Sequence, residues 1–284
     1  MKDYILKDGT KLTYETVGEG RPILFLHGWA GEHKRYWGHI MPLVANANYM
    51  AIGLDQRGTG GSSASMTRPV TQELMIDDVR DFIVGANLKN VTLVGSSQGG
   101  QIVMGYIGKY GEDEYLHSAV LVDIAPRNVM DENDPSYVWG QYGGNWKLSE
   151  ALSGIEAMKT DFDAFFRSFV LGVDPEVAKL PDEEQEQAVQ VYFGTVRKDE
   201  IVEEYESDLY ADHRQAIDTC TVPLAYFYAG SEKAFFTADL ENYYGDRVKG
   251  LYKAVNFHDD NHLFFWERGE EFSDELLKFL NTIK

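Results

Sequence analysis

The chain has 284 residues, enough for one large domain or two modest ones with a full hydrophobic core. Hydrophobic residues make up 44% and charged residues 25%, which is typical of a globular protein and excludes a disordered chain. The net charge of −20 disfavours nucleic acid and anionic membrane surfaces as partners, since both would repel the protein.

The cysteine content and the apolar runs indicate the compartment. Cys220 is the single cysteine, so no disulfide can form within the chain, and its place before an apolar strand indicates a packed side chain. Residues 1–8 lack the apolar region of a signal peptide, and no apolar run has the length of a membrane-spanning helix. We therefore expect a cytoplasmic protein that does not insert into membranes.

The predicted elements alternate between strand and helix over much of the chain. Residues 3–17 alternate around Asp8-Gly9-Thr10, which predicts a hairpin. Short apolar runs predict buried strands over 23–26, 49–54, 91–94, 118–124, 224–229 and 251–257. Apolar residues at helical spacing predict helices over 33–45, 72–87, 101–107 and 272–283. This alternation predicts an α/β fold with a mostly parallel central sheet flanked by helices.

The alternation stops between residues 127 and 220. That stretch contains no convincing strand, but it has acidic helix starts at Asp174-Pro175-Glu176 and at residues 181–184. We therefore predict a core domain of residues 1–126 and 221–284, with residues 127–220 inserted as a helical cap. Four cap phenylalanines share one helical face: Phe162, Phe165, Phe166 and Phe169. Most cap aromatics are expected to pack together, and a minority to line an apolar pocket between cap and sheet.

Residues 91–107 have the pattern of a nucleophile elbow. A buried strand is followed by Gly95-Ser96-Ser97-Gln98-Gly99 and then by a helix. The glycines permit a sharp turn and a close approach of the neighbouring chain. Ser97 is therefore predicted at the top of the sheet and at a helix N-terminus, where the partial positive charge favours an oxyanion.

A serine hydroxyl becomes a good nucleophile only when a base removes its proton. In this architecture the chain order is serine, acid, histidine, so the base is expected after the last strand. His258 and His262 are the candidates there. His262 is favoured because it follows polar loop residues and directly precedes an apolar helical segment, whereas His258 is expected on the surface.

These motifs together resemble the α/β-hydrolase superfamily, in its large group of capped serine esterases and related hydrolases. The resemblance consists of His27-Gly28-Trp29, Asp55-x-Arg57-Gly58-x-Gly60-x-Ser62, Gly95-x-Ser97-x-Gly99 and the His262 loop with Glu267. It implies that the backbone amides of Trp29 and Gln98 form an oxyanion hole. It also implies that His27 shapes its loop, and that Asp55 and Arg57 brace the turn beside the elbow.

The acid that orients the histidine departs from the pattern of most such hydrolases, in which an aspartate lies three residues after the glycine that ends the penultimate strand. That position holds Lys233, which cannot accept the imidazole proton. Asp123 is favoured instead, because some α/β-hydrolases carry their acid at the end of the strand that follows the elbow helix. Glu232 is the main alternative. Three further arrangements stay open: Asp259, Asp260 and a water-bridged contact.

A serine at the elbow excludes mechanisms that need an aspartate there, as in the usual epoxide hydrolases and haloalkane dehalogenases. We therefore predict a serine hydrolase that cleaves a small to medium, apolar or aromatic ester through an acyl-enzyme intermediate. Alternatives on the same residues are cleavage of a carbon–carbon bond, a lactone or an amide, and perhydrolysis. An alternative of another class is a ligand-sensing protein with vestigial turnover, which Lys233 at the acid position keeps open.

No cofactor or metal site is predicted. The acidic runs lack the histidine spacing of zinc sites and are expected to be solvated helix faces. Gly58-Thr59-Gly60-Gly61 lies within the Asp-x-Arg-Gly motif and not in a dinucleotide fingerprint. The expected partner is a small-molecule substrate, and the sequence leaves a homo-oligomer open.

Overall fold

The computed structural model describes residues 1–111, 113–130, 146–193, 196–230, 239–259 and 261–283. In this part of the chain the main sheet holds eight strands. Their spatial order is β1 (Lys2–Ile5), β2 (Lys11–Val17), β4 (Tyr49–Leu54), β3 (Arg21–Leu26), β5 (Val91–Ser96), β6 (Leu116–Val122), β9 (Leu224–Gly230) and β10 (Tyr252–Asp259). β2 pairs antiparallel with β1 and β4, and the other neighbours pair in parallel, which confirms the predicted sheet.

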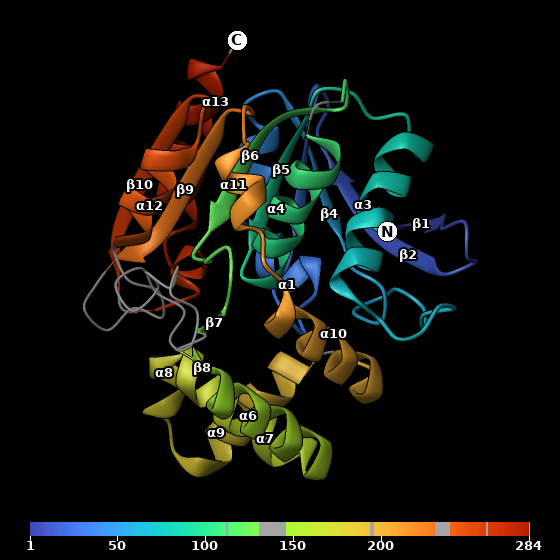
Figure 1. The fold of residues 1–284 in the computed structure, drawn as a ribbon, viewed down its shortest axis with the longest axis vertical. Coiled ribbons are helices and arrows are strands. Elements are labelled where there is room, and N and C mark those ends of the chain that lie inside the picture. Colours follow the sequence, from blue (N-terminus) through green and yellow to red (C-terminus); the bar gives the residue numbers. More distant parts are fainter. Residues whose placement is uncertain (112, 131–145, 194–195, 231–238, 260, 284) are drawn as a thin grey trace.

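Helices cover both faces of the sheet (Figure 1). Alternate side chains of a strand point to opposite faces, so Ile23 and Phe25 belong to one core and Leu24 and Leu26 to the other. The first core is covered by α1 (His33–Trp37), α2 (Met41–Ala45) and α13 (Gly269–Thr282). The second is covered by α3 (Gln72–Gly85), α4 (Gln98–Tyr110) and α12 (Asp239–Arg247). Burial on both faces explains why the central strands are continuous apolar runs in the sequence.

A layer of helices follows β6 and lies below the sheet in Figure 1, with α10 between that layer and the sheet. The described elements after β6 are, in chain order, β7 (Val129–Met130), β8 (Trp146–Lys147), α6 (Leu148–Thr160), α7 (Phe162–Val173), α8 (Pro175–Ala178), α9 (Asp182–Phe193), α10 (Lys198–Tyr210) and α11 (Arg214–Asp218). Buried side chains of α6 to α10 continue the first core, whereas Ile217 of α11 belongs to the second. The division into a core of 1–126 and 221–284 and a cap of 127–220 stays a prediction.

Two expectations about secondary structure were wrong. β7 and β8 pair in parallel within the stretch where no strand was expected, because strands of two residues are too short to show a pattern. The helix expected over 33–45 is divided into α1 and α2. Pro42 lacks an amide hydrogen, so it fits the first turn of α2 but not the interior of one long helix.

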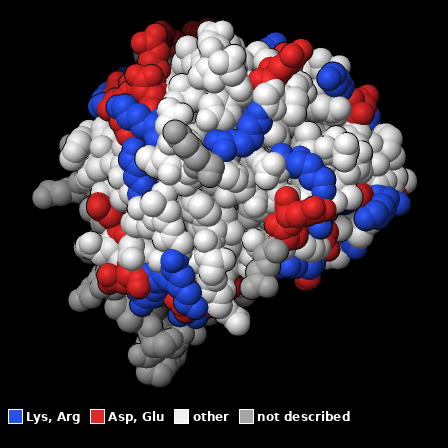
Figure 2. All heavy atoms as spheres, turned by 90° about the horizontal axis from the view of Figure 1, so that it is seen from above, with Lys and Arg blue, Asp and Glu red and all other residues white. Residues whose placement is uncertain are grey.

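On the face in Figure 2, acidic and basic side chains lie in small mixed groups separated by uncharged atoms. None of the described helices is both long enough and apolar enough to cross a membrane.

Candidate active site

The turn between β5 and α4 has the geometry of a nucleophile elbow. Ser97 has a φ of 53° and a ψ of −123°, a strained conformation for a residue with a side chain. A Cβ atom on Gly95 would collide with the carbonyl oxygen of Gly99. A Cβ atom on Gly99 would lie 2.6 Å from the carbonyl oxygens of Leu26 and His27. The two glycines are therefore needed where the turn packs against its own chain and against the end of β3.

Asp123 and His262 meet although 139 positions separate them in the chain. The Nδ1 atom of His262 lies 2.6 Å from Oδ2 of Asp123, and the two side chains are 5% and 0% exposed. The other carboxylate oxygen, Oδ1, accepts a hydrogen bond of 3.3 Å from the amide of Ala229. Binding at Nδ1 fixes the imidazole and leaves Nε2 as the nitrogen that can take a proton.

The other candidates for these two positions are placed differently. His258 is exposed, and its amide donates to Oδ1 of Asn256. Both carboxylate oxygens of Asp259 accept hydrogen bonds of 2.9 Å, one from the amide of Asn261 and one from Nε of Arg268. Three residues of the expected acid region lie outside the described residues: Glu232, Lys233 and Asp260.

Ser97 and His262 line the same small cavity, with a volume of about 20 Å³. A cavity of that size holds about one water molecule. The side chains around it are mainly aromatic: Trp29, Tyr36, Phe166 and Phe169. The two phenylalanines come from α7. Tyr36 was not identified from the sequence, since nothing in a predicted amphipathic helix distinguishes a cavity-lining tyrosine from a packed one.

Of the two residues of the expected oxyanion hole, Trp29 lines this cavity and Gln98 directly follows Ser97. Gln98 is the first residue of α4, and the first amides of a helix have no acceptor within the helix. The indole Nε1 of Trp29 donates to the carbonyl oxygen of Ile201 in α10, at 2.9 Å. The Trp29 ring lies 5.0 Å from the ring centroids of both Phe169 and Tyr205. The side chain of Trp29 is therefore held by α7 and α10, and the role of its backbone amide stays a prediction.

His27 shapes the loop beside Ser97, as expected. Its Nε2 accepts a hydrogen bond of 3.1 Å from the amide of Gln56, and its Nδ1 lies 2.8 Å from the carbonyl oxygen of Gly28. Complete burial lowers the pKa of His27 to about 4, so the imidazole is neutral at ordinary pH. Both ring nitrogens are occupied by the backbone, and His27 is not a second base.

Asp55 and Arg57 brace the adjacent turn, also as expected. Oδ1 of Asp55 accepts from the amide of His33 at 2.8 Å and lies 2.6 Å from Nδ1 of the same residue. Arg57 binds the carboxylate of Asp78 with Nε and Nη2, each at 2.5 Å. These buried contacts serve the structure of the loop, and none of the four side chains lines the cavity at Ser97.

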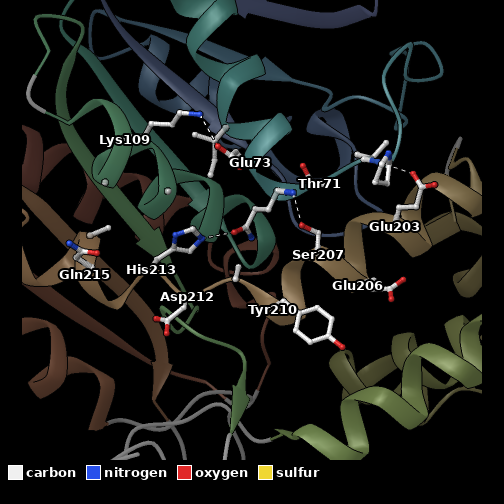
Figure 3. Close-up of a pocket in the computed structure, with 18 of the residues that line it drawn as sticks. Thr71, Glu73, Lys109, Glu203, Glu206, Ser207, Tyr210, Asp212, His213 and Gln215 are labelled. Carbon is white, nitrogen blue, oxygen red and sulfur yellow. Dashed lines mark hydrogen bonds and ion pairs between the residues drawn. The ribbon is translucent and has the colours of Figure 1, made fainter. Parts of the chain in front are cut away.

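A larger cavity lies elsewhere in the described part of the chain. It is a groove of about 1010 Å³ between α3, α4, α10 and α11, shown in Figure 3, and it includes neither Ser97 nor His262. Its charged side chains are paired, for example Lys109 with Glu73 at 3.2 Å and Asp212 with Arg214. Within the described part of the chain, no group of three or more His, Cys, Asp or Glu side chains is arranged to hold a metal ion.

Comparisons with known proteins bear on the fold family of the chain. The family model of the α/β hydrolase fold matches residues 21–269. A non-heme chloroperoxidase of Kitasatospora aureofaciens is 31% identical over 136 residues, which are 46% of this chain and 47% of that protein. The matched segment thus spans about half the length of that curated relative.

Two solved structures superpose over nearly the whole chain. An esterase from Exiguobacterium antarcticum has a TM-score of 0.82 at 23% identity, covering 99% of each chain. A bromoperoxidase from Bacillus anthracis has a TM-score of 0.82 at 21% identity, covering 99% of this chain and 100% of that one. Similarity at these identities shows the fold alone. Since the family model spans most of the sequence, the protein belongs to the α/β hydrolase fold family.

Proposed function

We propose that the protein is a serine hydrolase that cleaves a small ester through an acyl-enzyme intermediate. One observation carries the proposal: a buried Asp123–His262 contact of 2.6 Å reaches the same cavity as Ser97, which is held on a strained turn. A nucleophile, a base and a group that orients the base are the minimum for this chemistry.

In the proposed reaction, Nε2 of His262 removes the proton of Ser97 while Oγ attacks the ester carbonyl carbon. The carbonyl oxygen becomes an oxyanion that accepts hydrogen bonds from the amides of Trp29 and Gln98. Collapse of this intermediate breaks the ester bond, and the leaving alcohol takes the proton from His262. Water then attacks the acyl-enzyme in the same way, which releases the acid and restores Ser97.

The cavity supports a short acyl group. The space beside Ser97 is narrow and has aromatic walls, which favours the shortest acyl groups, because a long chain would displace Phe166 or Phe169. A second acceptor for the same acyl-enzyme is hydrogen peroxide, which would yield a peracid in place of the acid. The name of the 31%-identical chloroperoxidase motivates that candidate.

The test is hydrolysis of p-nitrophenyl acetate by the wild type, Ser97→Ala and Ser96→Ala. Ser96 is a matched control, because it is the adjacent serine, is fully buried and does not line the cavity. We expect Ser97→Ala to lower kcat by at least about 10³ and Ser96→Ala to retain turnover. Equal rates for the wild type and Ser97→Ala would contradict the proposal.

Two further arms of this experiment separate the alternatives. Faster loss of the acetyl-enzyme to hydrogen peroxide than to water would favour perhydrolysis. A folded wild type that turns over neither esters nor lactones nor amides would favour the ligand-sensing alternative.

A further inference from the structure

One face of α10 carries three buried carboxyl groups. Glu200, Glu204 and Asp208 follow one another at intervals of one helical turn, and they are 3%, 1% and 7% exposed. The expectation that acidic runs are solvated helix faces is therefore wrong for α10. Burial of a carboxylate is costly unless it is paired, so the partners of each group matter.

The outer two carboxyl groups have partners. Glu200 accepts hydrogen bonds of 3.2 and 3.1 Å from the amide of Ser65 and lies 3.7 Å from Nη1 of Arg68. Asp208 accepts from Nε2 of Gln72 at 2.5 Å and from Nδ2 of Asn128 at 3.0 Å.

Glu204 differs from its two neighbours on the helix. Both of its carboxyl oxygens are buried, and no described residue donates a hydrogen bond to either of them. Burial raises the pKa of Glu204 well above its usual range, and the charges of Glu200 and Asp208 raise it further. Arg57 and the side-chain amide of Gln98 act in the opposite direction without reversing the shift. Burial therefore favours the uncharged carboxylic acid form of Glu204, which has an O–H to donate.

The side chain of Gln98 offers an acceptor that lacks a donor among the described residues. It is 2% exposed, it adjoins Glu204, and its Oε1 is a buried acceptor without a donor in the described part of the chain. We propose that Glu204 is a positioning residue, whose O–H donates to Oε1 of Gln98 and so fixes the first residue of α4 directly after Ser97. This inference rests on the proposed function, in which the amide of Gln98 stabilises the oxyanion.

The same helix also binds the other expected donor residue. Ile201, next to Glu200, accepts the hydrogen bond from the indole of Trp29. α10 thus holds the side chains of both residues whose amides face the proposed oxyanion. Ionisation of Glu204 would remove its donor and place a negative charge beside a site where a second one develops, so it opposes the reaction.

The test compares the pH profile of kcat for p-nitrophenyl acetate in the wild type, Glu204→Gln and Glu206→Gln. We expect the wild-type kcat to fall on the alkaline side as Glu204 ionises. Glu204→Gln retains a donor but cannot ionise, so its alkaline fall should be absent. Glu206 is a matched control on the same helix that is partly exposed and paired with Lys159 at 2.9 Å, so Glu206→Gln should keep the wild-type profile.

A second variant separates positioning from charge. Glu204→Met has a similar volume, cannot ionise and has no donor. Its kcat should be independent of pH on the alkaline side but lower than that of Glu204→Gln by about tenfold, with KM nearly unchanged. Glutamine would thus rescue what methionine loses, and thermal unfolding of each variant shows that it is folded.

If kcat of Glu204→Gln falls at alkaline pH as much as that of the wild type, the inference is overturned. It is also overturned if kcat of the wild type does not fall at alkaline pH. The proposed function would survive either result, provided that turnover still depends on Ser97. Absence of Ser97-dependent turnover in the wild type would instead contradict the proposed function and this inference with it.

Discussion

At the scale of single residues, the contact between Asp123 and His262 is the main feature of the candidate site. β6 lies between β5 and β9 in the sheet, so its end is adjacent to the elbow and faces the loop that follows β10. Asp123 has a φ of 46°, and its amide donates to the carbonyl oxygen of Phe227 at 2.8 Å. Its backbone and both carboxylate oxygens are therefore fixed, which allows it to orient His262 from this strand.

We expect Asp123→Asn to lower kcat for p-nitrophenyl acetate by about 10⁴, because asparagine cannot hold the imidazole in the required tautomer. Glu232→Gln should change kcat by only a few-fold. Steady-state kinetics on both purified variants, with circular dichroism to verify folding, measures the difference. If Glu232→Gln is the more damaging change, Asp123 is not the acid.

At the scale of elements, α7 and Trp29 control the size of the cavity. Phe166 is buried with a ring centroid 5.6 Å from that of Trp29, whereas Phe165 and Phe169 are half-buried on the same ring. Phe166 and Phe169 line the cavity and Phe165 does not. Among the phenylalanines that the sequence predicts on one helical face, Phe166 and Phe169 thus line the cavity, whereas Phe165 only packs against Trp29.

Phe169→Ala should widen the cavity at a modest cost in stability, since this side chain is only half-buried. We expect kcat/KM for p-nitrophenyl hexanoate, relative to the acetate, to rise by about tenfold. Phe165→Ala is the control, because it removes a ring from the same helix and the same tryptophan without opening the cavity. An unchanged ratio in Phe169→Ala would show that this ring does not limit the acyl chain.

α10 should make stability depend on pH. Burial raises the pKa of Asp208 to about 7, above its value in the unfolded chain. The protonated side chain of Asp208 therefore stabilises the folded state fully below about pH 4. This contribution to the free energy of unfolding, at most about 4 kcal/mol, is lost as the pH rises to about 7.

Asp208→Asn cannot titrate, so its free energy of unfolding should fall less than that of the wild type between pH 4.5 and 8. Urea denaturation at both pH values measures this difference. Asp199→Asn, at an exposed position of the same helix, should parallel the wild type. A parallel course for Asp208→Asn would show that Asp208 titrates normally.

At the scale of the whole molecule, the sequence predicts the strands of the sheet better than the contacts between distant segments of the chain. The run 49–54 is β4 to the residue, because a strand buried on both faces consists of apolar residues alone. The sequence also identifies Ser97 and its elbow, since that turn requires glycines at fixed positions.

Contacts between distant segments could not be predicted in the same way. The choice of Asp123 over Asp259 depends on strand order and on partners such as Arg268, which no local pattern encodes. Glu204 was missed because an acid at helical spacing has the same sequence pattern whether its face is solvated or buried. Only the packing of α10 on the elbow distinguishes the two.

The most direct measurement of the central claim is labelling of the wild type with a fluorophosphonate at neutral pH, followed by mass spectrometry of its peptides. The account predicts one adduct, on Ser97, that is absent from Ser97→Ala and forms more slowly in Asp123→Asn. A folded wild type without an adduct on Ser97 would contradict it.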